Sequence, residues 1–307
     1  MKAVAFSQYG DPDVLSLTSM PSPVCGPGDV LVEVHAVSVN PVDGKIRSGR
    51  LKPLPGTFPA MTGRDGAGII RAVGPGAAGD LVGQRVCFVA PRGQGTWAEE
   101  IVLPAALVVP IPESMPFPEA ASLPLAGISA RIGLVETATV KPGMRVLIHA
   151  GAGGVGSMAV QLARHLGASV IATCSARNAE YVKSLGAAET IAYDEVPFEE
   201  HVENADMVFD LIGGDVHRRS YKVLRRGGTM VYLNAEPIED RGAEFGIDVR
   251  MAQVLPSRSA LAAIVERVER GVIRPTVERI LPFSDYAEAH RLSDQGHARG
   301  KIVLTVR

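Results

Sequence analysis

The sequence predicts an α/β protein of two domains, in which a parallel-sheet domain is inserted into a β-rich domain built from both ends of the chain. The chain has 307 residues, and at roughly 150 residues per domain this length suggests two domains. Short strand-like segments between glycine and proline turns fill the chain to about residue 115. Strands and helices then alternate, and the pattern becomes strand-rich again after about residue 270.

The first part of the chain contains short runs of apolar and β-branched residues. Glycine-containing turns at residues 27–28, 74–76 and 91–93 separate these runs. Glycine suits such turns because it adopts positive φ without steric cost. This spacing of strands and turns is typical of an antiparallel, barrel-like unit. The predicted strands are residues 30–36, 68–73, 85–89 and 97–103.

The middle of the chain alternates between apolar strands and amphipathic helices. Such alternation is the pattern of βαβ units, which build a parallel sheet. The predicted strands are residues 145–149, 169–173, 207–210 and 229–233, and the predicted helices are residues 119–137, 154–166, 178–185, 216–224 and 259–269. A final strand at residues 301–306 is expected to rejoin the first domain.

The composition excludes several classes of protein. With 31 Lys+Arg against 33 Asp+Glu the net charge is −2, which argues against general affinity for nucleic acid or anionic membranes. Cys25, Cys87 and Cys174 are too few and too far apart for a disulfide framework, which suggests a reducing compartment. The opening MKAVAFSQYG lacks the apolar run of a secretory signal. We therefore expect a cytoplasmic protein.

The most informative motif is a glycine turn. Gly151, Gly153 and Gly156 have G-x-G-x-x-G spacing between an apolar strand and a helix. In a dinucleotide site one glycine permits the tight turn, one lets the backbone approach a pyrophosphate, and one lets helix and strand pack closely. A plain strand–helix turn can also be rich in glycine, but the strand–turn–helix–strand order favours dinucleotide binding.

The end of the next strand indicates which dinucleotide binds. An NAD site places a carboxylate there, about 20 residues after the turn, to hold the ribose hydroxyls. Residues 171–177 contain no carboxylate, but they include Ser175 and Arg177, which can hold a 2′-phosphate. The sequence therefore predicts NADPH, although an arginine at a helix start is also a common solvated residue.

Five segments of the chain are informative together: AVSVNPVDGKIRSG at 36–49, GRDGAG at 63–68, ASLPLAGISA at 121–130, AGAGGVG at 150–156 and RGKIVL at 299–304. In this order along the chain they resemble the zinc-free quinone oxidoreductase branch of the medium-chain dehydrogenase/reductase superfamily. The resemblance implies a GroES-like substrate domain at residues 1–115 and 258–307 and a Rossmann NADPH-binding domain at residues 116–257. It also implies hydride transfer from NADPH to a quinone or an α,β-unsaturated carbonyl, and a homodimer.

The sequence argues against a zinc site. A catalytic zinc needs about three nitrogen or sulfur ligands. Asn40 stands where zinc-dependent relatives carry a cysteine, and Arg64 replaces their histidine. The histidines are scattered and are expected to be surface or supporting residues: His35, His149, His165, His201, His217, His290 and His297.

By resemblance Asn40 faces the nicotinamide, where its amide can bind a carbonyl oxygen or the nicotinamide ribose. Asn before Pro is also a common turn start. We take Asn40 and Lys45 as the candidate catalytic residues, since Lys45 or Arg47 can steady an enolate or pass a proton. A solvated basic surface is the alternative for both. Asp43 and Asp65 are expected to hold the loop by hydrogen bonds or to pair with Arg64.

The remaining candidates bind the cofactor by resemblance. Ser129 matches a hydroxyl residue at the nicotinamide, Tyr193 a tyrosine at the adenosine phosphate and Lys301 a lysine of the closing strand. The complete predicted cofactor set is Asn40, Ser129, Gly151, Gly153, Gly154, Val155, Gly156, Thr173, Ser175, Arg177, Tyr193, Leu233 and Lys301.

Two departures leave the substrate open. Leu51 follows Arg50 where many members carry a tyrosine after the first motif, and the segment 89–96 lacks a second common tyrosine. Water is then a candidate proton donor. One alternative is an enoyl-thioester reductase, with Arg47, Arg50 and Lys52 as a basic rim for the thioester arm. Another is an NADPH-binding protein without catalysis; the charge pattern argues against RNA as its partner.

Overall fold

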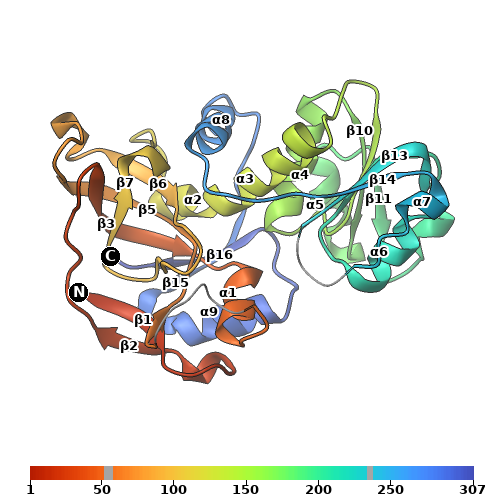
Figure 1. Cartoon of the computed structure of the whole chain (residues 1–307). Helices are drawn as coiled ribbons and strands as arrows, with labels where there is room; N and C mark the ends of the chain where they lie inside the picture. The colour runs from red at the N-terminus through yellow and green to blue at the C-terminus, as the bar shows by residue number, and fades with distance from the viewer. Residues whose placement is uncertain (52–57, 234–237) are drawn as a thin grey trace. The chain divides into compact units, whose positions relative to one another are not determined.

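The computed structural model describes residues 1–51, 58–233 and 238–307. The chain forms two compact units (Figure 1). The first contains Met1–Leu125, Leu255–Glu269 and Pro275–Arg307, and the second contains Ala126–Val254 and Arg270–Arg274. Within the described chain, every helix is too short or too polar to cross a membrane.

The first unit is built on a seven-stranded sheet of order β15-β16-β3-β5-β6-β8, with β7 paired to β3, and on a three-stranded sheet of order β2-β1-β4. All pairs except β15–β16 are antiparallel. Its strands are β1 (Lys2–Phe6), β2 (Ser16–Ser19), β3 (Asp29–Ser38), β4 (Ala60–Met61), β5 (Asp65–Val73), β6 (Arg85–Val89), β7 (Glu100–Pro104), β8 (Val108–Pro110), β15 (Val277–Pro282) and β16 (Lys301–Thr305). Its helices are α1 (Pro41–Arg47), α2 (Phe117–Ser122), α8 (Arg258–Glu269) and α9 (Tyr286–Asp294). Because β16 pairs with β3, the end of the chain completes the domain that its beginning starts, as predicted.

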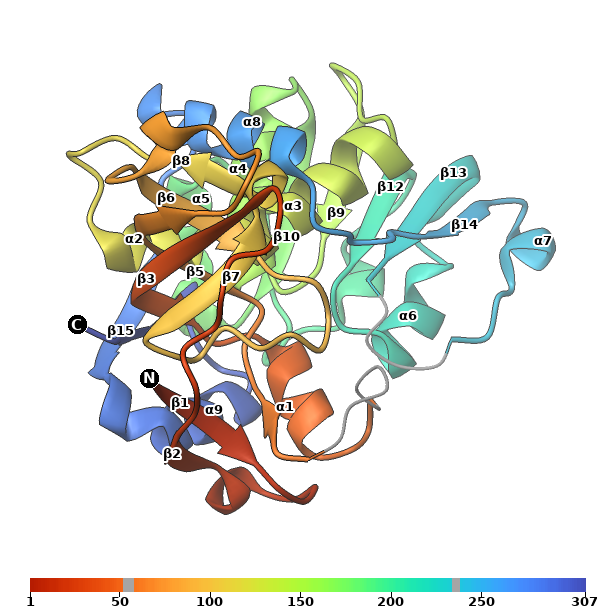
Figure 2. The ribbon, with the colours of Figure 1, turned by 60° about the vertical axis from the view of Figure 1, so that its left-hand side comes forward.

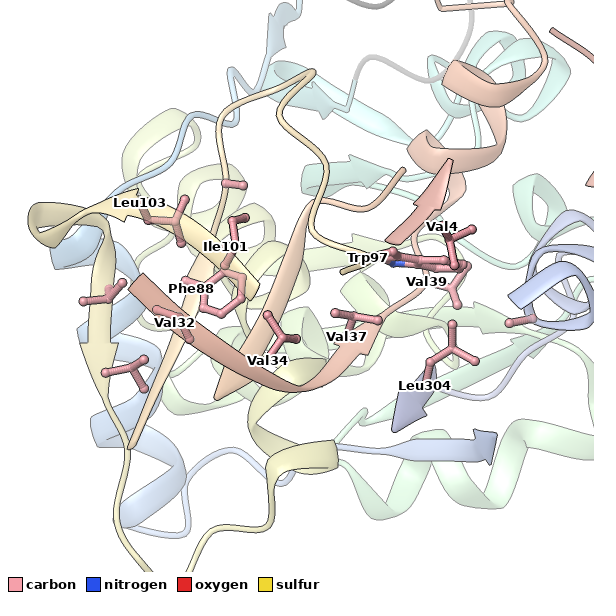
Figure 3. Close-up of a cluster of buried hydrophobic side chains, with 14 of the residues drawn as sticks. Val4, Val32, Val34, Val37, Val39, Phe88, Trp97, Ile101, Leu103 and Leu304 are labelled. Atoms are coloured by element: carbon pink, nitrogen blue, oxygen red, sulfur yellow. The ribbon is translucent and has the colours of Figure 1, made fainter. Parts of the chain in front are cut away.

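Alternation along β3 creates the core of this unit. Every second side chain from Val30 to Val34 is buried, and these valines belong to one buried cluster with Phe88 of β6 and Leu103 of β7. Figure 3 shows Val32 and Val34 in this cluster. Strands β3 and β7 run side by side (Figure 2). Trp97 is fully buried in the same cluster.

The second unit contains a parallel six-stranded sheet of order β11-β10-β9-β12-β13-β14. In chain order this is 3-2-1-4-5-6, the arrangement of a dinucleotide-binding Rossmann fold. Its strands are β9 (Arg145–Ile148), β10 (Ser169–Cys174), β11 (Glu189–Ala192), β12 (Ala205–Asp210), β13 (Leu224–Tyr232) and β14 (Asp248–Met251). Its helices are α3 (Pro124–Arg131, beginning at the end of the first unit), α4 (Gly154–His165), α5 (Ala179–Ser184), α6 (Gly214–Ser220) and α7 (Gly242–Phe245).

Two sequence predictions differ from the structure. The single helix at residues 119–137 is three segments, α2, α3 and a π-helical turn (Ile132–Thr137), because Pro124 has no N–H and starts a new helix. The first unit also continues to Leu125 instead of ending near residue 115, since α2 packs against β3 and β5. At the other boundary, α8 joins the first unit through Arg258, which donates to the carbonyl groups of Ala105 and Val108 at 3.1 and 2.6 Å.

Candidate functional site

Asn40 lies at the end of β3 and caps helix α1, and its carboxamide is held at both ends. Its Nδ2 donates to Asp65 Oδ1 at 2.9 Å, and its Oδ1 accepts from Lys301 Nζ at 2.5 Å. The second N–H of Nδ2 reaches Ser38 Oγ only at 3.5 Å, which is long for a hydrogen bond. Asn40 is 4% exposed, so the amide is fixed in orientation and keeps one weakly used donor.

Asp65 is the acceptor that organises this region. One carboxylate oxygen accepts from Ser38 Oγ at 2.7 Å and from Asn40, and the other accepts from the backbone N–H of Leu125 at 3.1 Å. The Asp65 carbonyl accepts from Thr96 Oγ1 at 3.0 Å. The prediction that Asp65 holds the loop by hydrogen bonds is confirmed. Its further role in orienting Asn40 was not predicted, because no pattern in the sequence indicates that contact.

Asp43 completes the capping of α1. Its Oδ2 accepts from Asn40 N at 2.9 Å, and its own N–H donates to the Asn40 carbonyl at 2.9 Å. Its Oδ1 is buried without a hydrogen-bond partner among the described residues. Burial, with repulsion from Asp65, raises the pKa of Asp43 to about 7.

Asp43→Asn is expected to flatten the pH dependence of stability. A carboxyl whose pKa is raised on folding binds more protons in the native state, so its stabilisation is complete below the unfolded pKa near 3.8 and is lost as pH rises through about 7. The variant should gain roughly 1 to 4 kcal/mol relative to the original protein between pH 5 and pH 8. Urea unfolding at both pH values measures this. Asp215→Asn, at an exposed carboxylate, is the control, and an unchanged slope in Asp43→Asn would contradict the account.

Lys301 lies at the start of β16 with its ammonium buried. Nζ donates to the Val39 carbonyl at 2.6 Å and to Asn40 Oδ1. Burial lowers its pKa, whereas Asp65 and Asp43 oppose that shift. Lys301 therefore holds Asn40 in place; its predicted contact with the cofactor stays a prediction.

Helix α1 contains two basic residues, Lys45 and Arg47, and their surroundings differ. Lys45 is half-buried. Arg47 is buried and donates to Asp294 Oδ2 at 2.7 Å, to His290 Nδ1 at 2.8 Å and to the Gly10 carbonyl at 3.0 Å. These contacts join α1 to α9, so Arg47 has a structural role. Its burial contradicts its place in a solvated basic rim, and its suggested role at an enolate stays a prediction.

The glycine turn follows β9 and leads into α4. A Cβ on Gly156 would lie 2.0 Å from the Ala150 carbonyl oxygen, and one on Gly151 would lie 2.8 Å from the Cβ of Ala172. A Cβ on Gly153 would meet only the Ala150 oxygen, at 3.4 Å. Gly151 and Gly156 are thus required for packing within the turn, whereas Gly153 presents its backbone to open space. Gly154 and Val155 are half-buried in the first turn of α4, where helix N–H groups lack intrahelical partners.

Buried polar side chains brace this turn from below. Thr173 Oγ1 accepts from Ala150 N at 3.3 Å and lies 3.0 Å from His149 Nδ1. His149 Nε2 lies 2.9 Å from Ser220 Oγ. Burial lowers the pKa of His149 to about 4, so the ring is neutral at pH 7. Thr173 was predicted to bind the cofactor. In the structure its hydroxyl group supports the glycine turn through hydrogen bonds.

Three histidines predicted to be surface or supporting residues are buried: His149, His217 and His290. His217 lies 2.7 Å from Asp210 Oδ2 and 3.2 Å from the Tyr221 hydroxyl. These rings are interior hydrogen-bonding groups. The surface interpretation was wrong for them, because a single sequence does not distinguish a satisfied core histidine from an exposed one.

The end of β10 has the predicted polar residues and one carboxylate that the prediction missed. Ser175 lies at the start of the short helical turn Ala176–Asn178, and its Oγ accepts from Asn178 Nδ2 at 3.0 Å. Arg177 is exposed on that turn. Tyr193 is 53% exposed and donates its backbone N–H to the Cys174 carbonyl. Asp194 Oδ1 accepts from Ala176 N at 2.8 Å; it follows the next strand, β11, so a search for an acid after β10 does not find it.

The other two predicted cofactor residues lie in the second unit. Ser129 is buried in α3, and Leu233 is half-buried directly after β13, where its N–H donates to the Asp210 carbonyl. Cys174 is buried at the end of β10, as a small core residue would be. Among the residues that the structure describes, no group of three or more His, Cys, Asp or Glu side chains is arranged to hold a metal ion.

Comparison with known proteins agrees with this architecture. Residues 26–113 match the alcohol dehydrogenase GroES-like domain, residues 185–304 the zinc-binding dehydrogenase family, and residues 126–213 the alanine dehydrogenase/PNT C-terminal domain. The NADPH-dependent alkenal/one oxidoreductase of Arabidopsis thaliana chloroplasts is 36% identical over 99% of this chain and 79% of its own length. The 2-haloacrylate reductase of a Burkholderia species is 33% identical over 98% of both chains.

The solved structures include one of similar length and fold. The quinone oxidoreductase from Coxiella burnetii superposes with a TM-score of 0.92 at 35% identity, over 100% of this chain and 99% of that one. Such identity over whole chains, with a GroES-like domain and a Rossmann sheet, establishes descent. The chain belongs to the medium-chain dehydrogenase/reductase superfamily of oxidoreductases, in its quinone oxidoreductase-like branch.

Proposed function

We propose that this protein is an NADPH-dependent, zinc-independent reductase of a quinone or an α,β-unsaturated carbonyl. The observation that carries the proposal is the clamped carboxamide of Asn40, held between Asp65 and Lys301 with one N–H left to donate. A fixed donor of this kind stabilises negative charge that develops on a carbonyl oxygen, because no reorganisation is needed during the reaction.

The residues at the carboxyl ends of β9 and β10 fit NADPH. Gly153 leaves room for the pyrophosphate beside the start of α4, and Arg177 with Ser175 can bind the 2′-phosphate. When bound, the nicotinamide supplies the hydride that the acceptor takes up at its electron-poor carbon. Asn40 would donate to the carbonyl oxygen, and Lys45 or water would deliver the proton.

The proposal of zinc independence is supported by the groups that stand at the family's metal position. Asn40 and Arg64 replace the cysteine and histidine ligands, and a guanidinium cannot bind a cation. The three ligands that a catalytic zinc requires would have to come from elsewhere.

The residues of the predicted basic rim do not support the enoyl-thioester alternative. Arg47 is committed to Asp294 and His290, Arg50 is exposed, and Lys52 lies outside the described residues. The non-catalytic alternative gains no support from Asn40, since a cofactor-binding protein has no need of a clamped donor at this position.

A homodimer and a cytoplasmic location remain parts of the proposal, with β14 at the sheet edge as a candidate dimer strand.

The test is NADPH oxidation at 340 nm with a panel of acceptors: 1,4-benzoquinone, 9,10-phenanthrenequinone, a 2-alkenal and a 2-enoyl-CoA. NADH is run in parallel, and each reaction is repeated with a chelator. We expect chelator-insensitive turnover with NADPH and a quinone or alkenal. Loss of activity on chelation would refute zinc independence, and tight NADPH binding without turnover would favour the binding protein.

Arg177→Ala is expected to reduce the preference for NADPH. A charge-assisted hydrogen bond to a phosphate contributes about 1.5 to 3 kcal/mol, so KM for NADPH should rise about 10- to 100-fold while KM for NADH changes little. Arg218→Ala, which removes another exposed arginine from the second unit, is the control. Equal effects on both cofactors would show that Arg177 does not bind the 2′-phosphate.

A further inference from the structure

Arg64 is a buried cation whose guanidinium is hydrogen-bonded only in part among the described residues. It lies directly before β5 and is 7% exposed. Its Nε donates to the Ala90 carbonyl at 3.2 Å, which uses one of the five N–H donors of a guanidinium. Its two terminal nitrogens have no hydrogen-bond partner in the described parts of the chain, and they keep some exposure to solvent.

The position of this side chain is fixed. The Ala90 N–H donates to the Arg64 carbonyl at 2.7 Å, so backbone and side chain of Arg64 are both bonded to the same residue at the end of β6. Strands β5 and β6 pair from Asp65–Val89 onward, which places this double contact at the end of the sheet. An arginine held in this way loses little further entropy when it binds a planar acceptor.

Charged groups of both signs lie around Arg64. The carboxylates of Asp43 and Asp65 attract it, and Arg92, in the loop after β6, repels it. Lys301, from β16, interacts with the same two carboxylates. The terminal N–H groups of Arg64 are nevertheless not used by hydrogen bonds in the described parts of the chain. Unsatisfied donors on a buried side chain are costly, and so an arginine at this position favours an anionic acceptor.

We propose that the terminal nitrogens of Arg64 bind the carboxylate of the substrate, so that the acceptor is an electron-poor alkene or quinone carrying a carboxylate near its carbonyl group. This inference rests on the proposed function, whose substrate class it narrows. The planar guanidinium matches a carboxylate with two parallel hydrogen bonds. Asp65, the next residue in the chain, accepts a hydrogen bond from Asn40. The proposed anion site at Arg64 and the proposed carbonyl donor at Asn40 are therefore linked through Asp65.

A carboxylate fits better than the phosphates of a thioester arm. Those phosphates lie many bonds from the reacting double bond, whereas Arg64 adjoins the residue that orients the carbonyl donor. Binding also has a chemical effect, since pairing the carboxylate with a cation withdraws electron density from the adjacent alkene and favours attack by a hydride.

The test compares 4-oxopent-2-enoate with its methyl ester as acceptors. The two acceptors differ only in the carboxylate. Comparing the acid-to-ester ratio of kcat/KM between variants cancels the difference in intrinsic reactivity between the two acceptors. We expect the acid-to-ester ratio to fall about 10- to 100-fold in Arg64→Gln, from the loss of charged hydrogen bonds. Arg64→Lys keeps the charge without the fork and should give a smaller fall. The control is Arg71→Gln, at a half-exposed arginine on the same strand that pairs with Glu33.

A binding measurement separates this inference from the proposed function. Thermal protection by 4-oxopentanoate, the saturated acid, is compared with protection by 2-pentanone, both in the presence of NADPH. Protection by the acid that Arg64→Gln abolishes would support the site even if no acceptor is turned over. Turnover with an unchanged acid-to-ester ratio in both variants would overturn it. Equal protection by chloride or sulfate would also overturn it, because the site would then bind small anions without selecting a substrate.

Discussion

Replacing Gly156 by alanine is expected to abolish NADPH binding and to destabilise the second unit. The new Cβ would lie 2.0 Å from the Ala150 carbonyl oxygen and 2.9 Å from the Cα of Gly151, and both are backbone atoms of the turn that cannot rotate away. Helix α4 would have to move off β9. Overpacking of this kind costs about 1 to 3 kcal/mol or more, and displacement of the helix start should raise the Kd for NADPH at least about 100-fold.

Two matched glycine variants separate the causes. Gly153→Ala meets only one atom, at 3.4 Å, so its melting temperature should stay close to the original while its methyl group obstructs the pyrophosphate. Gly79→Ala, in the first unit, has open space around it and should change neither property. Fluorescence titration with NADPH and thermal melts measure both. Normal binding by Gly156→Ala would mean that the turn does not hold the cofactor as proposed.

Lys301→Met is expected to be the most damaging change in the first unit. It removes a buried ammonium that donates to Val39 and Asn40 and deprives Asp65 and Asp43 of one of the cations that attract them. Removing one partner of a buried ionic cluster costs about 3 to 5 kcal/mol. The freed carboxamide of Asn40 should also lower kcat more than it raises KM, since a donor that acts on developing charge matters most in the transition state.

A double-mutant cycle tests whether Lys301 acts through charge. Asp43→Asn in the Lys301→Met background removes one of the carboxylates left behind, and we expect it to recover part of the lost stability. Lys183→Met, at an exposed lysine with a surface ion pair to Glu180, is the control and should cost less than about 1 kcal/mol. Additive effects of the two substitutions at 301 and 43 would contradict the proposed coupling.

Periodicity and turn residues were enough to predict most of the fold. Strands β9, β10 and β12 and helix α4 lie within a few residues of their predicted bounds because each is a long apolar or amphipathic run. Strand β11 was missed because it is short and only one of its four residues is buried, so it lacks a clear apolar pattern. The break at Pro124 was also missed, since apolar residues continue on both sides of it.

The candidate site was predictable only in part. The glycine turn is one continuous motif, and its geometry agrees with the roles assigned to its glycines. Asn40, Asp65 and Lys301 meet through side-chain contacts between segments 25 and 261 residues apart, and no local pattern reports such distances. The same holds for Arg47, which donates a hydrogen bond to Asp294, 247 residues further along the chain. The residues next to Arg47 in the sequence do not indicate this partner.

The most direct test of the account follows the transferred hydrogen. NADPH deuterated at C4, prepared separately as each of the two stereoisomers, is incubated with the protein and a 2-alkenal, and the product is analysed by mass spectrometry and NMR. The account predicts one deuterium at the β-carbon from one stereoisomer, none from the other, and no effect of a chelator. Reduced product without deuterium from either stereoisomer would contradict direct hydride transfer, and the proposed function with it.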